Sequence, residues 1–119
     1  MPEHRQRLTL PEIQREVWQL LEVRPGHRPS MTGIAGRLDR SYRQFCRDIK
    51  PTKHTGRQLR SWCCITYAAH LIGKGVKVEA AMALAGLHNH THFNERFREY
   101  LACLPHEARS LELQLLRAS

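Results

Sequence analysis

Three histidines, His88, His90 and His92, stand two residues apart in the stretch GLHNHTHFNERF. Neutral imidazole is a common zinc ligand, so this spacing raises the question of a metal site. Zinc needs four converging ligands, however, and residues two apart on a helix point to different sides, so His90 and His92 cannot share one ion within a helix. The chain also has no Cys-x-x-Cys pair. We therefore expect no metal and no cofactor, and interpret the histidines as the start of a helix that faces a DNA groove.

Other reactive residue types form no catalytic arrangement. Cys103 and His106 match a nucleophile and its base only in residue type, and core and surface positions explain them better. The sequence contains no Gly-rich phosphate loop and no nucleophile elbow. Neighbouring Cys63 and Cys64 point about 100° apart on a helix, so we expect two buried hydrophobic side chains rather than a disulfide. We expect a protein that is not an enzyme.

Positive charge is concentrated in the middle of the chain. The 119 residues carry a formal net charge of +8, and residues 37–60 alone hold eight basic and two acidic side chains. Four of the basic residues recur at spacings of three and four, along one stripe of a helix: Arg40, Arg43, Arg47 and Lys50. Such a stripe can follow a phosphate backbone. No segment approaches the ~20 apolar residues that cross a bilayer, and no secretion signal is visible, so we expect a cytoplasmic protein with no membrane partner.

Helix signals follow one another along the chain, with no strand-like alternation to compete with them. Seven helices are expected, with starts near Thr9, Ser30, Ser41, Arg57, Lys77, Asn89 and Pro105. Ser41 with Gln44 three residues on is a capping-box signature for the third helix. Tyr42, Phe45 and Ile49 have the spacing of its inward face. The sequence therefore predicts an all-α fold.

The fourth of these helices, about Arg57 to Ile72, is apolar over most of its circumference, which is typical of a helix buried on several sides. It joins two similar segments, MTGIAGRLDRSYRQFCRDI and VEAAMALAGLHNHTHFNERF. Each predicts a short helix, a tight turn and a second helix with exposed polar residues, which is the helix-turn-helix plan. We expect a single DNA-binding domain over 1–119, with helix-turn-helix subdomains at 9–54 and 75–109, a linker helix at 55–74 and a helical tail at 110–119.

The second segment resembles the signature of AraC/XylS-type bacterial transcription regulators. In AGLHNHTHFNERFREYLACLP, a Gly and an apolar residue precede Phe-x-x-x-Phe, and a Pro follows eight residues after the second Phe. The first segment and LRSWCCITYAAHLI resemble the family's first motif and linker helix, so that the likeness runs from about Leu10 to Arg109. Four positions depart from the family pattern: Asp39, Cys64, Lys77 and Ala102. We expect these departures to affect the DNA sequence that is read more than the fold.

The resemblance implies that the second helix of each motif reads bases in the major groove. Carried over by position, the base-contacting residues are Arg43, Cys46, Arg47, His90, Thr91 and Glu95. Backbone contacts are expected from Arg40, Gln44, Lys50, Lys53, Arg57, Arg60, Asn94 and Arg98. A guanidinium suits the O6 and N7 acceptors of guanine, and a carboxylate can accept from the cytosine amine.

The resemblance further implies a stand-alone regulator, nucleoid-associated in the cytoplasm, that binds double-stranded DNA as a monomer and activates transcription through contact with RNA polymerase. Two alternatives remain open. One is a sequence-tolerant architectural nucleic-acid binder of a phage or mobile element. The other is a protein-interaction module in which four tail leucines form a homodimer seam: Leu111, Leu113, Leu115 and Leu116.

Overall fold

The computed structural model describes residues 8–105, which contain six α-helices and no strand. The helices are α1 (Leu10–Val23), α2 (Met31–Arg37), α3 (Tyr42–Asp48), α4 (Gly56–Gly73), α5 (Val78–Leu84) and α6 (His90–Leu101), with a short 3-10 helix, η2, at Lys50–Thr52. The all-α prediction is confirmed. The expected seventh helix, beyond its first residue Pro105, and the tail at 110–119 lie outside the described residues.

The helix starts follow the capping signals in the sequence. Full capping boxes open α3 and α4: Ser41 exchanges hydrogen bonds with Gln44, and Thr55 does the same with Gln58. Each box satisfies backbone N–H groups that a helix leaves without a partner at its start. Lys77, in the capping position of α5, makes no side-chain hydrogen bond to the helix. A lysine at this position offers no side-chain acceptor for the first backbone N–H groups of the helix.

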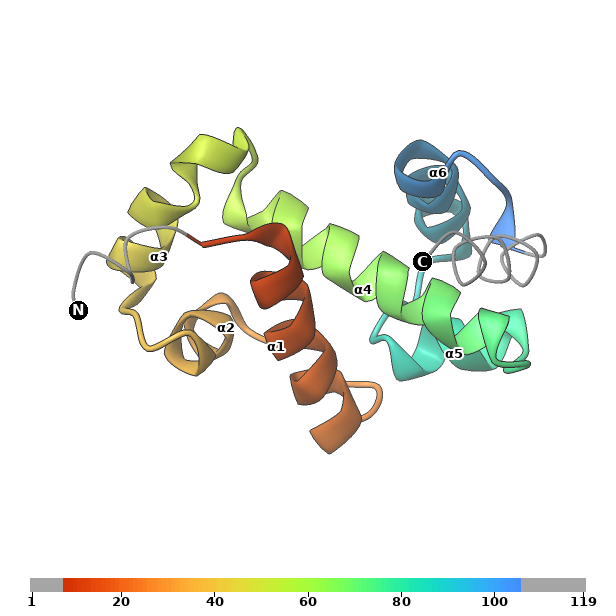
Figure 1. The fold of residues 1–119 in the computed structure, drawn as a ribbon. Coiled ribbons are helices and arrows are strands. Elements are labelled where there is room, and N and C mark those ends of the chain that lie inside the picture. Colours follow the sequence, from red (N-terminus) through yellow and green to blue (C-terminus); the bar gives the residue numbers. More distant parts are fainter. Residues whose placement is uncertain (1–7, 106–119) are drawn as a thin grey trace.

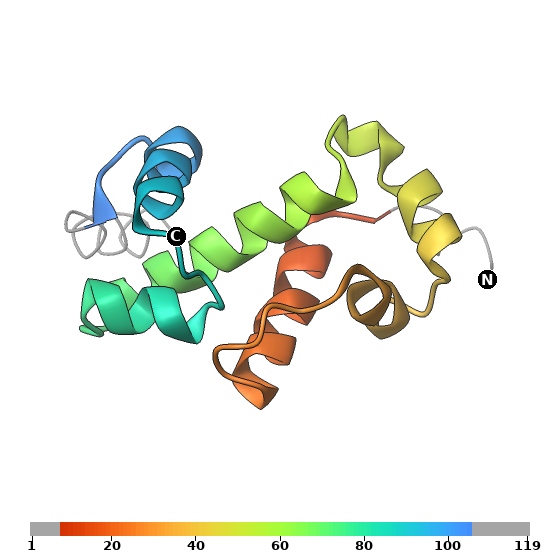
Figure 2. The ribbon, with the colours of Figure 1, turned by 180° about the vertical axis from the view of Figure 1, so that it is seen from behind.

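Helix α4 is the spine of the molecule. In both views it runs through the middle, with α1, α2 and α3 beside its first half and α5 and α6 beside its second half (Figures 1 and 2). Its buried side chains point in several directions: Leu59, Cys63, Cys64, Ile65, Tyr67, Ala68 and Ile72. Burial on several sides explains why apolar residues occupy most of the circumference of this helix. Among residues 8–105, no helix combines the length and apolarity needed to cross a membrane.

Polar contacts fix α1 to α4 inside this arrangement. The Trp18 indole donates to the carbonyl of Cys63 at 3.1 Å, and the Gln14 amide donates to the hydroxyl of Thr66 at 3.0 Å. The Trp18 ring also packs edge-on against Tyr67, with ring centroids 5.7 Å apart. Because partly buried donors are costly to leave without acceptors, these bonds set the rotation of α1 on α4 as well as its position.

Two pairs of consecutive helices are joined by short turns, α2 with α3 and α5 with α6; we call these pairs the helix-turn-helix units. Both turns contain a residue in the left-handed region, Asp39 at φ 58° and Gly86 at φ 74°; aspartate and glycine adopt this region more readily than most residues. Phe45 and Ile49 are buried beneath α3, but the expected burial of Tyr42 is wrong, because this side chain is 49% exposed. Tyr42 is the first residue of this seven-residue helix, and its side chain lies at the surface.

Candidate nucleic-acid interface

The outer face of α3 carries the residues expected to read the first DNA segment. Arg43 and Arg47 are both exposed, and the Arg47 side chain keeps 67% of its surface accessible. Cys46 is half-buried between them. The burial of Phe45 and Ile49 on the opposite face turns these three side chains outward. Two guanidinium groups are therefore presented one helical turn apart.

Arg40 departs from the basic stripe expected from its spacing. Its side chain is only 9% exposed, and its Nε lies 2.7 Å from a carboxylate oxygen of Asp48. A second nitrogen donates to the carbonyl of Leu38, also at 2.7 Å. The turn at Asp39 folds Arg40 back across the end of α3, so its charge is neutralised inside the protein. Arg40 therefore supports the turn, and its neutralised charge makes it a weaker candidate for a DNA backbone contact than the exposed basic residues.

The other backbone candidates of the first half remain at the surface. Gln44 is exposed, although its carbonyl oxygen accepts from the backbone N–H of Ser41 in the capping box. Lys50 lies in η2 and Lys53 just after it, and both are exposed. Their ammonium groups have no described ion pair in residues 8–105 and are free to meet an anion.

The start of α6 presents a second polar face. Five candidate residues are exposed on it: His90, Thr91, Asn94, Glu95 and Arg98. Phe93 and Phe97 are buried on the opposite side, with ring centroids 5.5 Å apart, where α6 packs on α4. His92, which precedes Phe93, is exposed as well.

The histidines can now be placed individually. His88 precedes α6, and it lines a small cavity of about 160 Å3 together with His92, four residues later. The sequence pattern of alternate histidines drew attention to His90 and His92 instead. Across the described residues 8–105, no three side chains of the His, Cys, Asp or Glu type come together as a group that could hold a metal ion.

A contact between the two halves fixes the loop that joins α1 and α2. The backbone N–H of Gly26 in this loop donates to the carbonyl of Leu84 at the end of α5, at 3.0 Å. Two residues later, the backbone of Arg28 passes so close to Gly86 that a β-carbon there would lie 2.8 Å from the Arg28 nitrogen. Gly86 is thus required both for its left-handed backbone and for its lack of a side chain. We refer to this pair of contacts as the loop–turn contact.

The loop also meets α4 through Arg60. This half-buried side chain donates to the carbonyl of Pro29 at 3.3 Å. Burial, followed by the positive charges of Arg28 and Arg57, holds the pKa of Arg60 below its usual value. Neither periodicity nor motif singled out Arg28, because it stands in a loop and approaches α4 only in the folded chain. Arg57, by contrast, is exposed as expected.

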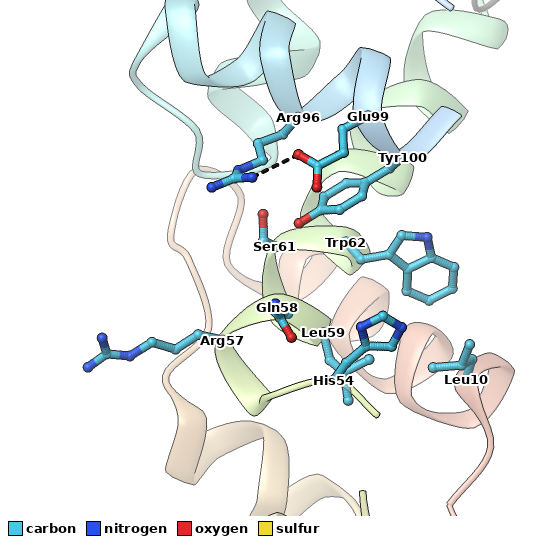
Figure 3. Close-up of a pocket in the computed structure, with 10 residues that line it drawn as sticks. All are labelled: Leu10, His54, Arg57, Gln58, Leu59, Ser61, Trp62, Arg96, Glu99 and Tyr100. Atoms are coloured by element: carbon cyan, nitrogen blue, oxygen red, sulfur yellow. Dashed lines mark hydrogen bonds and ion pairs between the residues drawn. The ribbon is translucent and has the colours of Figure 1, made fainter. Parts of the chain in front are cut away.

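A cleft of about 510 Å3 opens between α1, α4 and α6 (Figure 3). Arg96 and Glu99 of α6 form an ion pair of 2.8 Å above it, and Ser61 and Trp62 of α4 lie opposite. Arg57 stands at the rim and points away from the other lining side chains. The cleft lies where the two halves face each other across α4, with an uncompensated positive charge at its edge.

The buried cysteines behave as hydrophobic residues. Cys63 and Cys64 have no exposed surface, and neither takes part in a disulfide. Burial raises the pKa of both thiols, to about 11 for Cys64, so they stay protonated at neutral pH. Only the thiolate is a strong nucleophile, and these two side chains are therefore unreactive.

Comparisons with known proteins address the fold. No model of a known protein family matches the sequence, and no curated protein matches it. The structure is similar to the crystal structure of a DNA-binding transcriptional dual regulator from Escherichia coli K-12, with a TM-score of 0.62. The match covers 86% of this chain and 93% of that chain, at 21% sequence identity. The two chains therefore share an all-α fold over most of their length.

Proposed function

We propose that this protein is a sequence-specific, double-stranded DNA-binding transcription regulator of the AraC/XylS type. The observation that carries the proposal is the exposure of polar residues on the second helix of both helix-turn-helix units. In such units the N-terminal part of that helix enters the major groove. Two units on one spine would let a single chain read two neighbouring segments.

The division of the chain follows from this proposal. Residues 9–54 and 75–109 are the two reading subdomains, 55–74 the linker helix and 110–119 a tail. The longest dimension of the protein is 42 Å, which accommodates two recognition helices about one DNA turn, ~34 Å, apart. The shared fold with a DNA-binding transcriptional dual regulator supports the same class of function.

Individual roles follow from exposure and chemistry. Base contacts are assigned to Arg43, Cys46, Arg47, His90, Thr91 and Glu95. Backbone contacts are assigned to Gln44, Lys50, Lys53, Arg57, Arg60, Asn94 and Arg98. Phosphate contacts set the register of the protein on the duplex, whereas contacts to base edges select the sequence. The proposal includes binding as a monomer and activation through contact with RNA polymerase, which transcription reconstituted with purified polymerase would test.

The decisive experiment is selection of random duplex DNA by the purified protein near physiological salt, followed by sequencing. Two short enriched blocks with centres about 10 base pairs apart are expected if α3 and α6 read one face of the duplex. A single block would restrict base reading to one helix.

A second candidate function is architectural binding without sequence choice. The surplus of positive charge favours it, because phosphate contacts alone support binding that ignores sequence. Under this alternative, the selection yields no enriched block, and affinity for every duplex falls steeply as salt rises.

A further inference from the structure

Three arginines lie between the start of α3 and the start of α6, on or beside the surface of α4. Arg57 and Arg60 lie close enough to Tyr42, the first residue of α3, for their charges to act on its hydroxyl. Arg28 neighbours Arg60, and it lines the small cavity that His88 also lines, just before α6. We call Arg28, Arg57 and Arg60 the arginine band. It runs between the two helices proposed to read DNA.

The arginine band carries positive charge that no carboxylate offsets. The described ion pairs of residues 8–105 involve other arginines, and none joins a member of the band to Asp or Glu. Arg60 remains protonated although burial and Arg28 lower its pKa, because a guanidinium does not lose its proton under protein conditions. The free protein therefore holds repelling charges side by side, an arrangement that an anion bound between them would relieve.

The position of Arg28 is prepared before any partner binds. Its main chain rests against Gly86, and the next residue, Pro29, accepts a hydrogen bond from Arg60. The loop is therefore held from both halves of the molecule, and Arg28 is presented without the entropy cost of ordering a free loop. Arginine is also the side chain whose planar fork suits phosphate oxygens best.

Geometry indicates which part of the DNA would meet these charges. A protein that enters two major-groove segments on one face of a duplex leaves the intervening minor groove, and the phosphates along its edges, facing its own middle. In this molecule the middle is the surface of α4 that carries Arg57 and Arg60, flanked by Arg28.

We propose that the arginine band binds the DNA backbone between the segments met by α3 and α6, with Arg28 as a phosphate contact. The proposal rests on the proposed function in assuming that one duplex crosses both helices. It adds a contact from outside both helix-turn-helix units.

The test compares Arg28→Ala with Arg15→Ala, which removes the same charge from an exposed position of α1 where the nearest described carboxylate, that of Glu16, is 3.8 Å away. Binding to a selected duplex and to an unrelated duplex is measured over a salt series. Loss of one phosphate contact makes the slope of log affinity against log salt shallower by about 0.9. We expect this change for Arg28→Ala on both duplexes, no change for Arg15→Ala, and restoration by Arg28→Lys.

The outcomes separate the two proposals. If the salt slope of Arg28→Ala is unchanged and the unaltered protein shows a sequence preference, the proposed role of the arginine band is wrong. The proposal that the protein is a sequence-specific regulator then still stands. If the salt slope of Arg28→Ala is shallower but the unaltered protein shows no sequence preference, the DNA contact of the arginine band is supported. The proposal of a sequence-specific regulator is then wrong. Urea unfolding without DNA provides the control for folding: because repulsion is relieved, Arg28→Ala should be at least as stable as the unaltered chain, and a lower midpoint would contradict the repulsion.

Discussion

The backbone nitrogen of Arg28 lies 2.8 Å from the position that a β-carbon on Gly86 would occupy, although 58 residues separate the two in the chain. Real β-carbons do not come so close to a backbone atom, so any side chain at position 86 must displace the loop between α1 and α2. The contact therefore links the turn of the second helix-turn-helix unit to a loop that belongs to the first half of the molecule.

Replacing Gly86 by Ala should destabilise the protein more than replacing Gly26 by Ala. Both glycines have positive φ, which costs an L-residue roughly 1–2 kcal/mol. A β-carbon on Gly26 meets only the carbonyl of Ala83 at 3.5 Å, an ordinary contact, so Gly86→Ala should lose about 1–3 kcal/mol more through steric overlap. Urea unfolding measures both. Gly36→Ala, inside α2 where a β-carbon meets nothing within 4 Å, should not destabilise the protein and is the control. Equal losses at positions 26 and 86 would refute the loop–turn contact.

Arg40→Ala should act on stability, whereas Arg43→Ala should not. Removing Arg40 leaves the partly buried Asp48 carboxylate with only the exposed Arg47, 3.8 Å away, as an ion-pair partner, which we expect to cost about 2 kcal/mol of unfolding free energy. Arg43 is exposed and should change stability by less than about 0.5 kcal/mol. Chemical unfolding of the two variants gives the comparison. If Arg40→Ala unfolds like the unaltered protein but shows a shallower salt slope in DNA binding, then Arg40 is a phosphate contact after all.

The buried thiols should make stability fall at high pH. Burial raises the pKa of the Cys64 thiol to about 11 in the folded chain, above its usual value near 9, so the folded state keeps a proton that the unfolded state releases. Stability is therefore complete below about pH 9 and decreases as pH rises towards 11. A Cys64→Ala variant should show a weaker decrease in urea unfolding between those values. At pH 8 an alkylating reagent should leave Cys63 and Cys64 unmodified in the native protein, and rapid modification would contradict their burial.

Substitutions of base-contacting residues should affect DNA binding differently from substitutions of phosphate-contacting residues. Arg43→Ala and Glu95→Ala are expected to weaken binding to the selected sequence by about 1–3 kcal/mol each and to relax the preference at one position. Lys53→Ala should lower affinity on every sequence and reduce the salt slope by about 1. Titration of a selected and a scrambled duplex distinguishes these effects. If Arg43→Ala keeps the full preference, α3 does not read bases.

Local signals in the sequence were sufficient to predict the six α-helices of residues 8–105. The capping box of Ser41 and Gln44 depends on residues three positions apart, and the structure confirms it. Spacing alone did not indicate that Arg40 pairs with Asp48, because this partner is reached only after the turn folds the chain back. The spacing of basic residues in a sequence does not reveal which of them, like Arg40, form ion pairs within the protein.

The candidate interface was less accessible to prediction for the same reason. Arg28 stands in a loop without periodicity, and it approaches Arg60, 32 positions later, only once both halves have packed on α4. The second requirement on Gly86, space for the Arg28 backbone, is equally invisible in a turn motif that explains the glycine by φ alone. Contacts between distant loops come from tertiary packing, which no local pattern encodes.

The loop–turn contact also limits how such a protein can change during evolution. If α4 alone connected the halves, either half could be exchanged with that of a relative to make a hybrid with a new target. Here the loop between α1 and α2 must fit the end of α5 and the turn that follows it. Gly26 donates a hydrogen bond to Leu84, and Gly86 leaves no room for a side chain. A transplanted second half with a bulkier turn would push away the loop that carries Arg28. The halves must therefore be inherited, or engineered, as a matched pair.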